Sequence, residues 1–121
     1  MIKNFEDLKV WEKAHKLVLD VYKTTQKYPK EEIYCLVSQM RRAMISVAAN
    51  IAEGKKRNSV ADFMHFLNMA DTSLEEVKYY LILSKDLKYI TEPEMKNLYD
   101  KSTEVGLMLT GLERSLKKFK R

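Results

Sequence analysis

The sequence has little of the residues that build turns, disulfides and membrane spans. Its 121 residues include only 3 Gly, 2 Pro and 1 Cys. So little Gly and Pro argues against a loop-rich β-sandwich or barrel. The lone Cys35 excludes an intrachain disulfide and predicts a reducing, cytoplasmic setting. The longest nearly apolar stretch, residues 43–52, is too short to span a bilayer, so no membrane association is expected. The charged start, with Lys3, Glu6 and Asp7, predicts that there is no signal peptide.

The composition is that of a small folded domain with a basic surface. Hydrophobic residues make up 45% and charged residues 32% of the chain, which is enough to form a core and argues against intrinsic disorder. Lys and Arg number 22 against 17 Asp and Glu, so the net charge is +5 and the pI about 9.2. This balance is compatible with an anionic partner.

Apolar residues recur at alternating spacings of three and four in four segments, which predicts helices packed side by side. We place these helices at about residues 5–28, 31–54, 59–87 and 92–119. Pro29 ends the first helix, and Gly54 is expected to cap the end of the second. Ser59 and Thr91 are expected to cap the starts of the third and fourth. The predicted fold is all-α, one antiparallel up-down-up-down four-helix bundle over residues 1–121.

Each predicted helix has more apolar width than one bundle core requires. The additional residues could widen the face turned to the core, or they could form a second interface between subunits. The abundance of Tyr and Met in a short chain favours oligomerisation. We call each row of apolar residues at spacings of three and four a seam. The additional apolar residues outside these main seams are Trp11, Tyr22, Ile45, Phe66, Met69, Tyr80, Leu83 and Met108.

The second helix also carries a line of polar residues on one face. A buried amide or guanidinium without a partner costs about 1–3 kcal/mol, so these side chains need partners. Hydrogen bonding within the chain or between subunits is the favoured interpretation, and ligand binding is the alternative. The stripe consists of Gln39, Arg42, Ser46, Asn50 and Glu53, and Arg41 lies beside it.

The up-down-up-down order brings the start of the first and third helices to the same end as the close of the second and fourth. We predict that this basic end binds nucleic-acid phosphates, although Lys and Arg at helix C-termini also complement the helix dipole. Its basic residues are Lys3, Lys9, Lys55, Lys56, Arg57, Lys117, Lys118, Lys120 and Arg121. The opposite end has balanced charges.

Enzymatic chemistry has weak support. Glu12 with His15 and Asp62 with His65, added to Glu53 and Glu104, resemble the ligands of a di-metal bundle, but the helical seams direct Glu12 away from the core. Cys35 is expected to be a small buried thiol. No catalytic residue, metal or cofactor is predicted.

Residues 5–14, with the sequence Phe-Glu-Asp-Leu-Lys-Val-Trp-Glu-Lys-Ala, resemble the start of the four-helix bundle family encoded by intervening sequences in 23S rRNA genes. The segment 39–54, with Gln-Met-Arg-Arg-Ala, Ser46 and Asn-Ile-Ala-Glu-Gly, resembles the family's central motif. Where the family usually has glycine, this chain has Cys35, Thr72 and Lys88. The resemblance implies a homopentameric ring with no established enzymatic activity. The family is also similar to accessory proteins of diversity-generating retroelements, whose rings bind nucleic acid and a reverse transcriptase.

The sequence therefore predicts a non-enzymatic, ring-forming bundle that binds structured nucleic acid, rRNA-like RNA or DNA, or a nucleoprotein partner. A protein-interaction scaffold that binds no nucleic acid is the main alternative. A di-metal bundle enzyme is the minor one.

Overall fold

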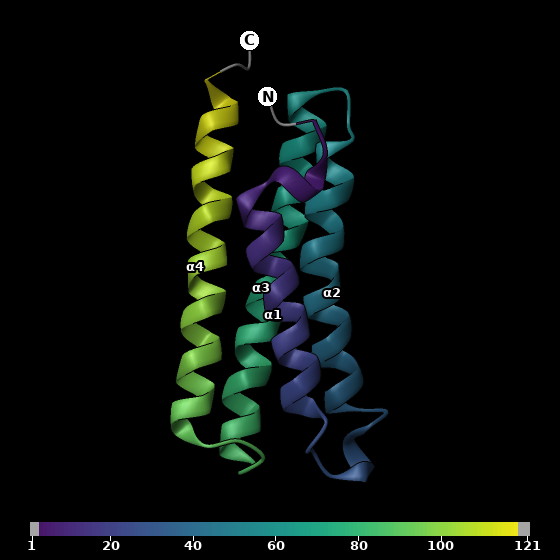
Figure 1. The fold of residues 1–121 in the computed structure, drawn as a ribbon, viewed down its shortest axis with the longest axis vertical. Coiled ribbons are helices and arrows are strands. Elements are labelled where there is room, and N and C mark those ends of the chain that lie inside the picture. Colours follow the sequence, from purple (N-terminus) through teal and green to yellow (C-terminus); the bar gives the residue numbers. More distant parts are fainter. Residues whose placement is uncertain (1–2, 119–121) are drawn as a thin grey trace.

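The structure, a computed structural model, describes residues 3–118. Four long helices, α1 (Lys9–Thr25), α2 (Leu36–Lys55), α3 (Val60–Asp86) and α4 (Glu92–Lys117), are accompanied by two short 3-10 turns, η1 (Phe5–Asp7) and η2 (Lys30–Glu32). The chain runs down α1, up α2, down α3 and up α4 (Figure 1). The predicted all-α four-helix bundle is confirmed. None of the helices in residues 3–118 is long and apolar enough to cross a membrane.

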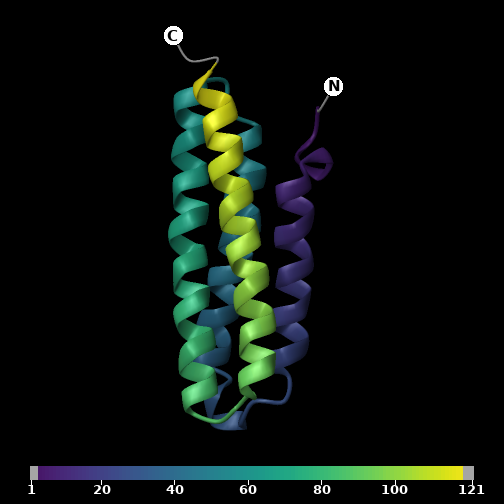
Figure 2. The same cartoon turned by 90° about the vertical axis from the view of Figure 1, so that its left-hand side faces the viewer.

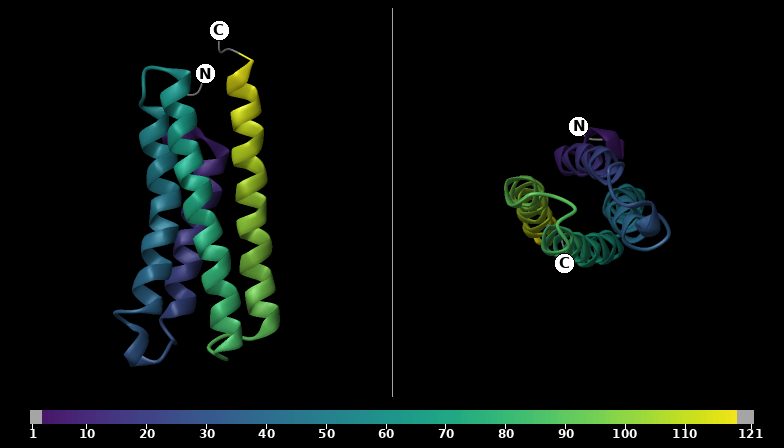
Figure 3. Two further views of the ribbon diagram at one scale, coloured as in Figure 1. Left: turned by 180° about the vertical axis from the view of Figure 1, so that it is seen from behind. Right: turned by 90° about the horizontal axis from the view of Figure 1, so that it is seen from below.

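One face of each helix supplies the core, as the spacing of three and four predicts. The helices lie around a common axis, with α1 beside α2 and α4, and α3 diagonally across from α1 (Figures 2 and 3). The packing between α2 and α3 is the most extensive of the helix pairs. The largest fully buried side chains include Leu17, Met40, Met44, Ile51, Leu67, Leu74, Leu81 and Leu109.

The first two helices are shorter than predicted. Residues 5–7 form η1, and Leu8 is extended (φ −78°, ψ 123°), so α1 begins at Lys9. The second helix begins at Leu36, because residues 30–35 form η2 and a turn. Two expectations in that turn are wrong: Ile33, which the apolar spacing of the predicted second helix places in the core, is 46% exposed, and the Cys35 thiol is exposed. Phe119, predicted at the end of the fourth helix, lies outside the described residues.

The predicted starts of α3 and α4 are confirmed in detail. The Ser59 hydroxyl accepts a hydrogen bond from the Asp62 amide at 3.1 Å. Thr91 accepts from the Glu94 amide at 3.2 Å, and the Glu94 carboxylate accepts from the Thr91 amide at 2.9 Å. This reciprocal pair satisfies two backbone donors that a helix start otherwise leaves unpaired.

The end of α3 contains an unusual backbone conformation. Lys88 has φ 66°, in the left-handed region that glycine adopts most easily. The Lys88 amide donates to the Lys85 carbonyl and the Tyr89 amide donates to the Ser84 carbonyl, both at 2.9 Å. These two bonds form a Schellman motif, which ends the helix. Lys88 is thus a lysine at a position suited to glycine.

The additional apolar residues fall into two groups, half-buried and exposed. Trp11, Tyr80, Leu83 and Met108 pack against the core as half-buried side chains, so they widen it. Phe66 and Met69 are also half-buried, whereas Tyr22 is 37% and Ile45 42% exposed. Other large apolar side chains are more than half exposed, and these are Tyr34, Leu107, Tyr79 and Leu19.

Candidate nucleic-acid interface

The basic residues are held at one end of the bundle by the helix order. Figure 1 shows η1, the connection between α2 and α3, and the end of α4 at the same end. Of the nine basic residues predicted there, Lys120 and Arg121 lie outside the described residues. The other seven are Lys3, Lys9, Lys55, Lys56, Arg57, Lys117 and Lys118.

Four of these cations line a single groove. The groove has a volume of about 500 Å³ and lies between the segment 3–6 and the end of α2. Its lining residues are Lys3, Asn4, Phe5 and Glu6 on one wall and Ala52, Glu53, Lys55, Lys56 and Arg57 on the other. Lys3 and the 55–57 cluster, about fifty residues apart in sequence, thus meet across one concave surface. Lys9, Lys117 and Lys118 do not line it.

The wall formed by residues 3–6 is held in place by short-range contacts. The Asn4 amide donates to Asp7 Oδ2 at 3.4 Å, and the Leu8 amide donates to the Phe5 carbonyl at 2.9 Å. The Leu8 side chain is buried in the core, so it anchors the turn between this wall and α1. Asn4, Phe5 and Glu6 were not predicted as site residues. The sequence signal that could have found them is the apolar Phe5 shortly before the first helical seam, with the capping residue Asn4 directly ahead of it.

The opposite wall depends on Gly54, whose predicted role is wrong. Gly54 is a buried residue inside α2 and has no positive φ, so it is not a C-cap. An added Cβ would lie 2.9 Å from Phe63 Cδ1 and 2.9 Å from Phe66 Cβ. Such distances are too short for ordinary contact, so glycine permits a close approach of α2 to α3. Because Lys55 and Lys56 follow Gly54 directly, the close packing of α2 on α3 positions both lysines.

Arg57 is the most constrained cation of the groove. Its guanidinium carbon lies 4.5 Å from the centre of the Phe66 ring, a cation–π distance. Its Nη2 atom is 3.8 Å from a carboxylate oxygen of Glu53, a long contact between two exposed groups. Within residues 3–118, no carboxylate lies within 4.0 Å of the ammonium groups of Lys3, Lys55 or Lys56. The groove therefore keeps a positive field available to a ligand.

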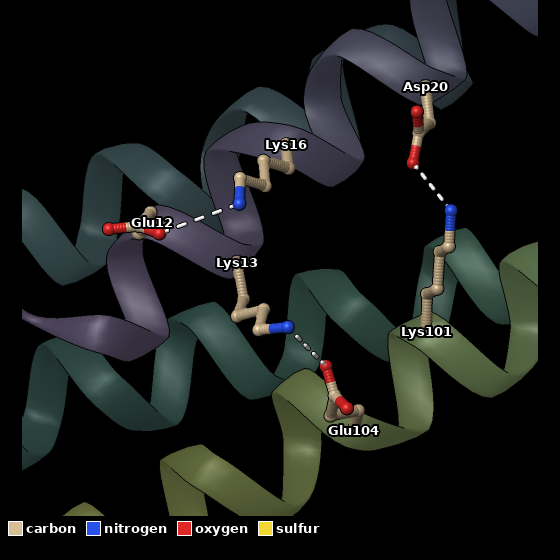
Figure 4. Close-up of polar contacts among 6 residues, drawn as sticks. All are labelled: Glu12, Lys13, Lys16, Asp20, Lys101 and Glu104. Carbon is tan, nitrogen blue, oxygen red and sulfur yellow. Dashed lines mark hydrogen bonds and ion pairs between the residues drawn. The ribbon is translucent and has the colours of Figure 1, made fainter.

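Lysines on the sides of the bundle are mostly neutralised. Lys13 contacts Glu104 at 3.5 Å, and Lys101 contacts Asp20 at 3.2 Å, so both pairs connect α1 to α4 (Figure 4). Lys16 pairs with Glu12 along α1 at 3.5 Å. A second groove of about 320 Å³ lies along this seam, but its charges are largely balanced.

The opposite end also uses its charges internally. Lys27 donates to the Glu94 carboxylate, and with the Thr91 amide it lowers the pKa of Glu94 to about 2. The Tyr89 hydroxyl donates to Glu32 at 2.7 Å, which raises the pKa of Tyr89 to about 12. The first hydrogen bond favours the ionised form of Glu94, and the second favours the protonated form of Tyr89. They tie the α1–α2 connection to the first turn of α4 and to the α3–α4 connection.

The predicted polar stripe on α2 divides into two groups. The Ser46 and Ser73 hydroxyls are 2.9 Å apart, and the Asn50 amide nitrogen donates to the Ser46 carbonyl at 2.8 Å and hydroxyl at 3.0 Å. Gln39, Arg42 and Glu53 are exposed. Ser46 thus links α2 to α3 within the chain, and Asn50 supports Ser46 from within α2.

Arg41 faces the other neighbour of α2. Its Nε donates to Thr25 Oγ1 at 3.0 Å and its Nη2 donates to the Tyr22 carbonyl at 3.3 Å. The guanidinium also lies 4.4 Å from the centre of the Tyr22 ring. It therefore adds a hydrogen bond to a carbonyl in the last turn of α1, which also accepts from the Thr25 hydroxyl at 3.3 Å.

The residues considered as metal ligands are dispersed. Among the described residues, no group of three or more His, Cys, Asp or Glu side chains could hold a metal ion. Glu12 and Glu104 are paired with lysines, and the His15 ring is stacked on Trp11 with centroids 5.0 Å apart.

Comparisons with known proteins agree with this architecture. Residues 6–111 match the family model described as 23S rRNA-intervening sequence protein. A crystal structure of a protein of unknown function from the S23 ribosomal protein family of Bacteroides thetaiotaomicron VPI-5482 is 27% identical, with a TM-score of 0.77. The match covers 86% of this chain and 97% of the other. The search of curated proteins gives no match.

Proposed function

The chain belongs to the 23S rRNA-intervening sequence protein family, and we propose that it is a non-enzymatic, ring-forming bundle that binds structured nucleic acid through its basic end. An rRNA-like RNA is the first ligand to test, and DNA the second. The relative of known structure is described as having unknown function, so the proposal is carried by the geometry of this chain.

The observation that carries the proposal is the groove between residues 3–6 and the end of α2. Four cations from two distant segments line it, whereas the lysines of the α1–α4 seam are paired with carboxylates. Phosphates of nucleic acids are bound by Lys and Arg side chains such as these, with release of counterions. Helix dipoles alone account for cations after α2, but they do not account for Lys3 before α1.

Ring formation is supported by exposed apolar side chains on three different helices of the bundle. Leu19 is 55% exposed on α1, while Tyr79 on α3 and Leu107 on α4 are 58% and 69% exposed. A cyclic ring larger than a dimer requires two different, complementary surfaces on each subunit. The expected pentamer has five times the 14.3 kDa mass of the chain, which light scattering measures. Because Leu107 is largely exposed, Leu107→Glu should dissociate the ring without unfolding the subunit.

The test of nucleic-acid binding is the salt dependence of affinity for a structured RNA. Replacing Lys55, Lys56 and Arg57 together by Ser removes three charges from the groove and leaves the buried seams unchanged. If all three neutralise phosphates, the log–log salt slope should become shallower by about 2–3 per protomer. Affinity should fall for all sequences alike, because phosphate contacts carry no sequence information.

The matched control removes three exposed cations from the opposite end, by changing Lys23, Lys30 and Lys88 to Ser. It lowers the net charge equally, so it should change the salt slope much less. Equal losses from both triple variants would show that only net charge matters. Absence of binding by the wild-type protein at low salt would favour the protein-interaction scaffold instead.

A further inference from the structure

The basic groove contains more than phosphate ligands. Alongside the cations, its lining includes the half-buried Phe5, Asn4 and the acidic residues Glu6 and Glu53. Carboxylates oppose the binding of a phosphate, and an aromatic ring contributes nothing to it. A site for phosphates alone therefore does not explain this lining.

The dimensions of the groove restrict its ligand. Its volume of about 500 Å³ lies within the usual range of pockets for small organic ligands, roughly 300–1,000 Å³. A single nucleotide is a ligand of that class. A base in a duplex is stacked and paired inside the helix, so its face is not available to a protein ring.

We propose that the groove holds one nucleotide of an unpaired strand, with its base against Phe5 and its phosphates at Lys55 and Lys56. This inference rests on the proposed function and specifies which part of a nucleic acid the basic end recognises. Proteins that bind single strands combine a positive groove with aromatic rings on which bases stack. Loops and ends of a structured RNA supply such unpaired bases.

The two carboxylates define which bases fit. A carboxylate only accepts hydrogen bonds, so Glu6 and Glu53 suit bases with an exocyclic amino group, such as cytosine. Uracil has a carbonyl oxygen where cytosine has its amino group. The groove should therefore prefer cytosine to uracil. The Glu53 carboxylate can accept such a bond because its contact with Arg57 is long, at 3.8 Å.

Phe5 is positioned by a chain of aromatic contacts. Its ring meets Trp11 edge to face, with centroids 5.0 Å apart and planes at 69°. Trp11 in turn stacks on His15 at 5.0 Å and 4°. Since Trp11 is the single tryptophan of the chain, its fluorescence reports on the neighbourhood of Phe5. Occupation of the groove should change that fluorescence, whereas binding at Lys117 and Lys118 should not.

The experiment measures the affinity of the full chain for labelled oligo(C), oligo(U) and a blunt RNA duplex, each of about 12 nucleotides, by fluorescence anisotropy. Oligo(C) should bind at least about fivefold more tightly than the duplex, with a change in Trp11 emission. It should also bind about fivefold more tightly than oligo(U). Phe5→Leu should weaken binding of oligo(C) by about fivefold or more, while Phe5→Tyr keeps the ring and should preserve it.

Two further variants complete the test. Glu53→Gln changes an exposed residue, so it should keep the melting temperature and reduce the preference for oligo(C) over oligo(U). Tyr34→Leu removes an aromatic ring that is 91% exposed at the opposite end, and it should change nothing. Equal affinity for strand and duplex, with Phe5→Leu inert, would overturn this inference and leave phosphate binding by the basic end intact. Binding of none of the three probes at low salt would overturn the proposed function itself.

Discussion

Replacing Gly54 by alanine tests whether the basic groove depends on the close approach of α2 to α3. The added methyl group would lie 2.9 Å from Phe66 Cβ and 2.9 Å from Phe63 Cδ1. The Phe63 ring can turn away, but Phe66 Cβ is attached directly to the backbone of α3. The two helices must therefore separate locally.

Two opposing effects set the magnitude. Alanine in a helix interior is favoured over glycine by about 1 kcal/mol. Inserting a methyl group into a packed interface costs about 1–3 kcal/mol. The overpacking is expected to win, so Gly54→Ala should lower the free energy of unfolding by up to about 2 kcal/mol. For a chain of this length the melting temperature should then fall by up to about 8 °C.

The other two glycines are the matched controls. A Cβ at Gly111 meets nothing within 4 Å, and a Cβ at Gly106 is 3.5 Å from Leu74 Cδ2, an ordinary contact. Gly111→Ala and Gly106→Ala should therefore stabilise the bundle by about 0.5–1 kcal/mol in urea or thermal unfolding. A Gly54→Ala protein as stable as the Gly111→Ala protein would refute the close-approach argument. Gly54→Ala should also weaken RNA binding, because the displaced α2 end carries Lys55 and Lys56.

Three further predictions concern stability. Lys88→Gly should raise the free energy of unfolding by about 1 kcal/mol in urea titrations, because it removes a left-handed conformation from a side-chain-bearing residue. Lys27→Met should lower the free energy of unfolding above about pH 4.5. The difference from the wild type should shrink as the pH falls towards 2, because Lys27 stabilises the fold only where the Glu94 carboxylate, whose pKa is lowered, is ionised. Asn50→Ala should cost about 1 kcal/mol in thermal unfolding, whereas Arg42→Ala, at an exposed site, should keep the melting temperature and change only the oligomeric mass.

The helices could be predicted because their seams repeat, but the ends of α1 and α2 could not. A helical period says which residues face the core. It does not say where a chain leaves the helix to make a tertiary contact. Residues 30–35 leave α-helical geometry, and the Glu32 carboxylate there accepts from Tyr89. These two residues are 57 positions apart, and local propensity contains no information about such a pair.

The wrong prediction for Gly54 and the cap at Lys88 that no glycine marks have a common cause. A glycine near the end of a helical pattern fits both a C-cap and a close helix contact, and Gly54 is distinguished only by the positions of Phe63 and Phe66 on the next helix. Conversely, the left-handed cap after α3 carries Lys88, so no glycine marks it in the sequence. A residue type predicts the backbone conformation only where its surroundings allow a single conformation.

Charge at the basic end followed from topology, because the order of four antiparallel helices determines which termini meet. Topology did not predict which of the cations remain available to a ligand, because that depends on ion-pair partners far along the chain. Lys13 looks as free in the sequence as Lys55, yet it contacts Glu104 on α4 at 3.5 Å. Lys3, by contrast, is brought to Lys55 only because the turn 5–7 is anchored by the buried Leu8. A count of basic residues therefore overestimates the ligand-binding charge along the sides of the bundle and cannot locate the groove, which is formed where two non-periodic segments meet.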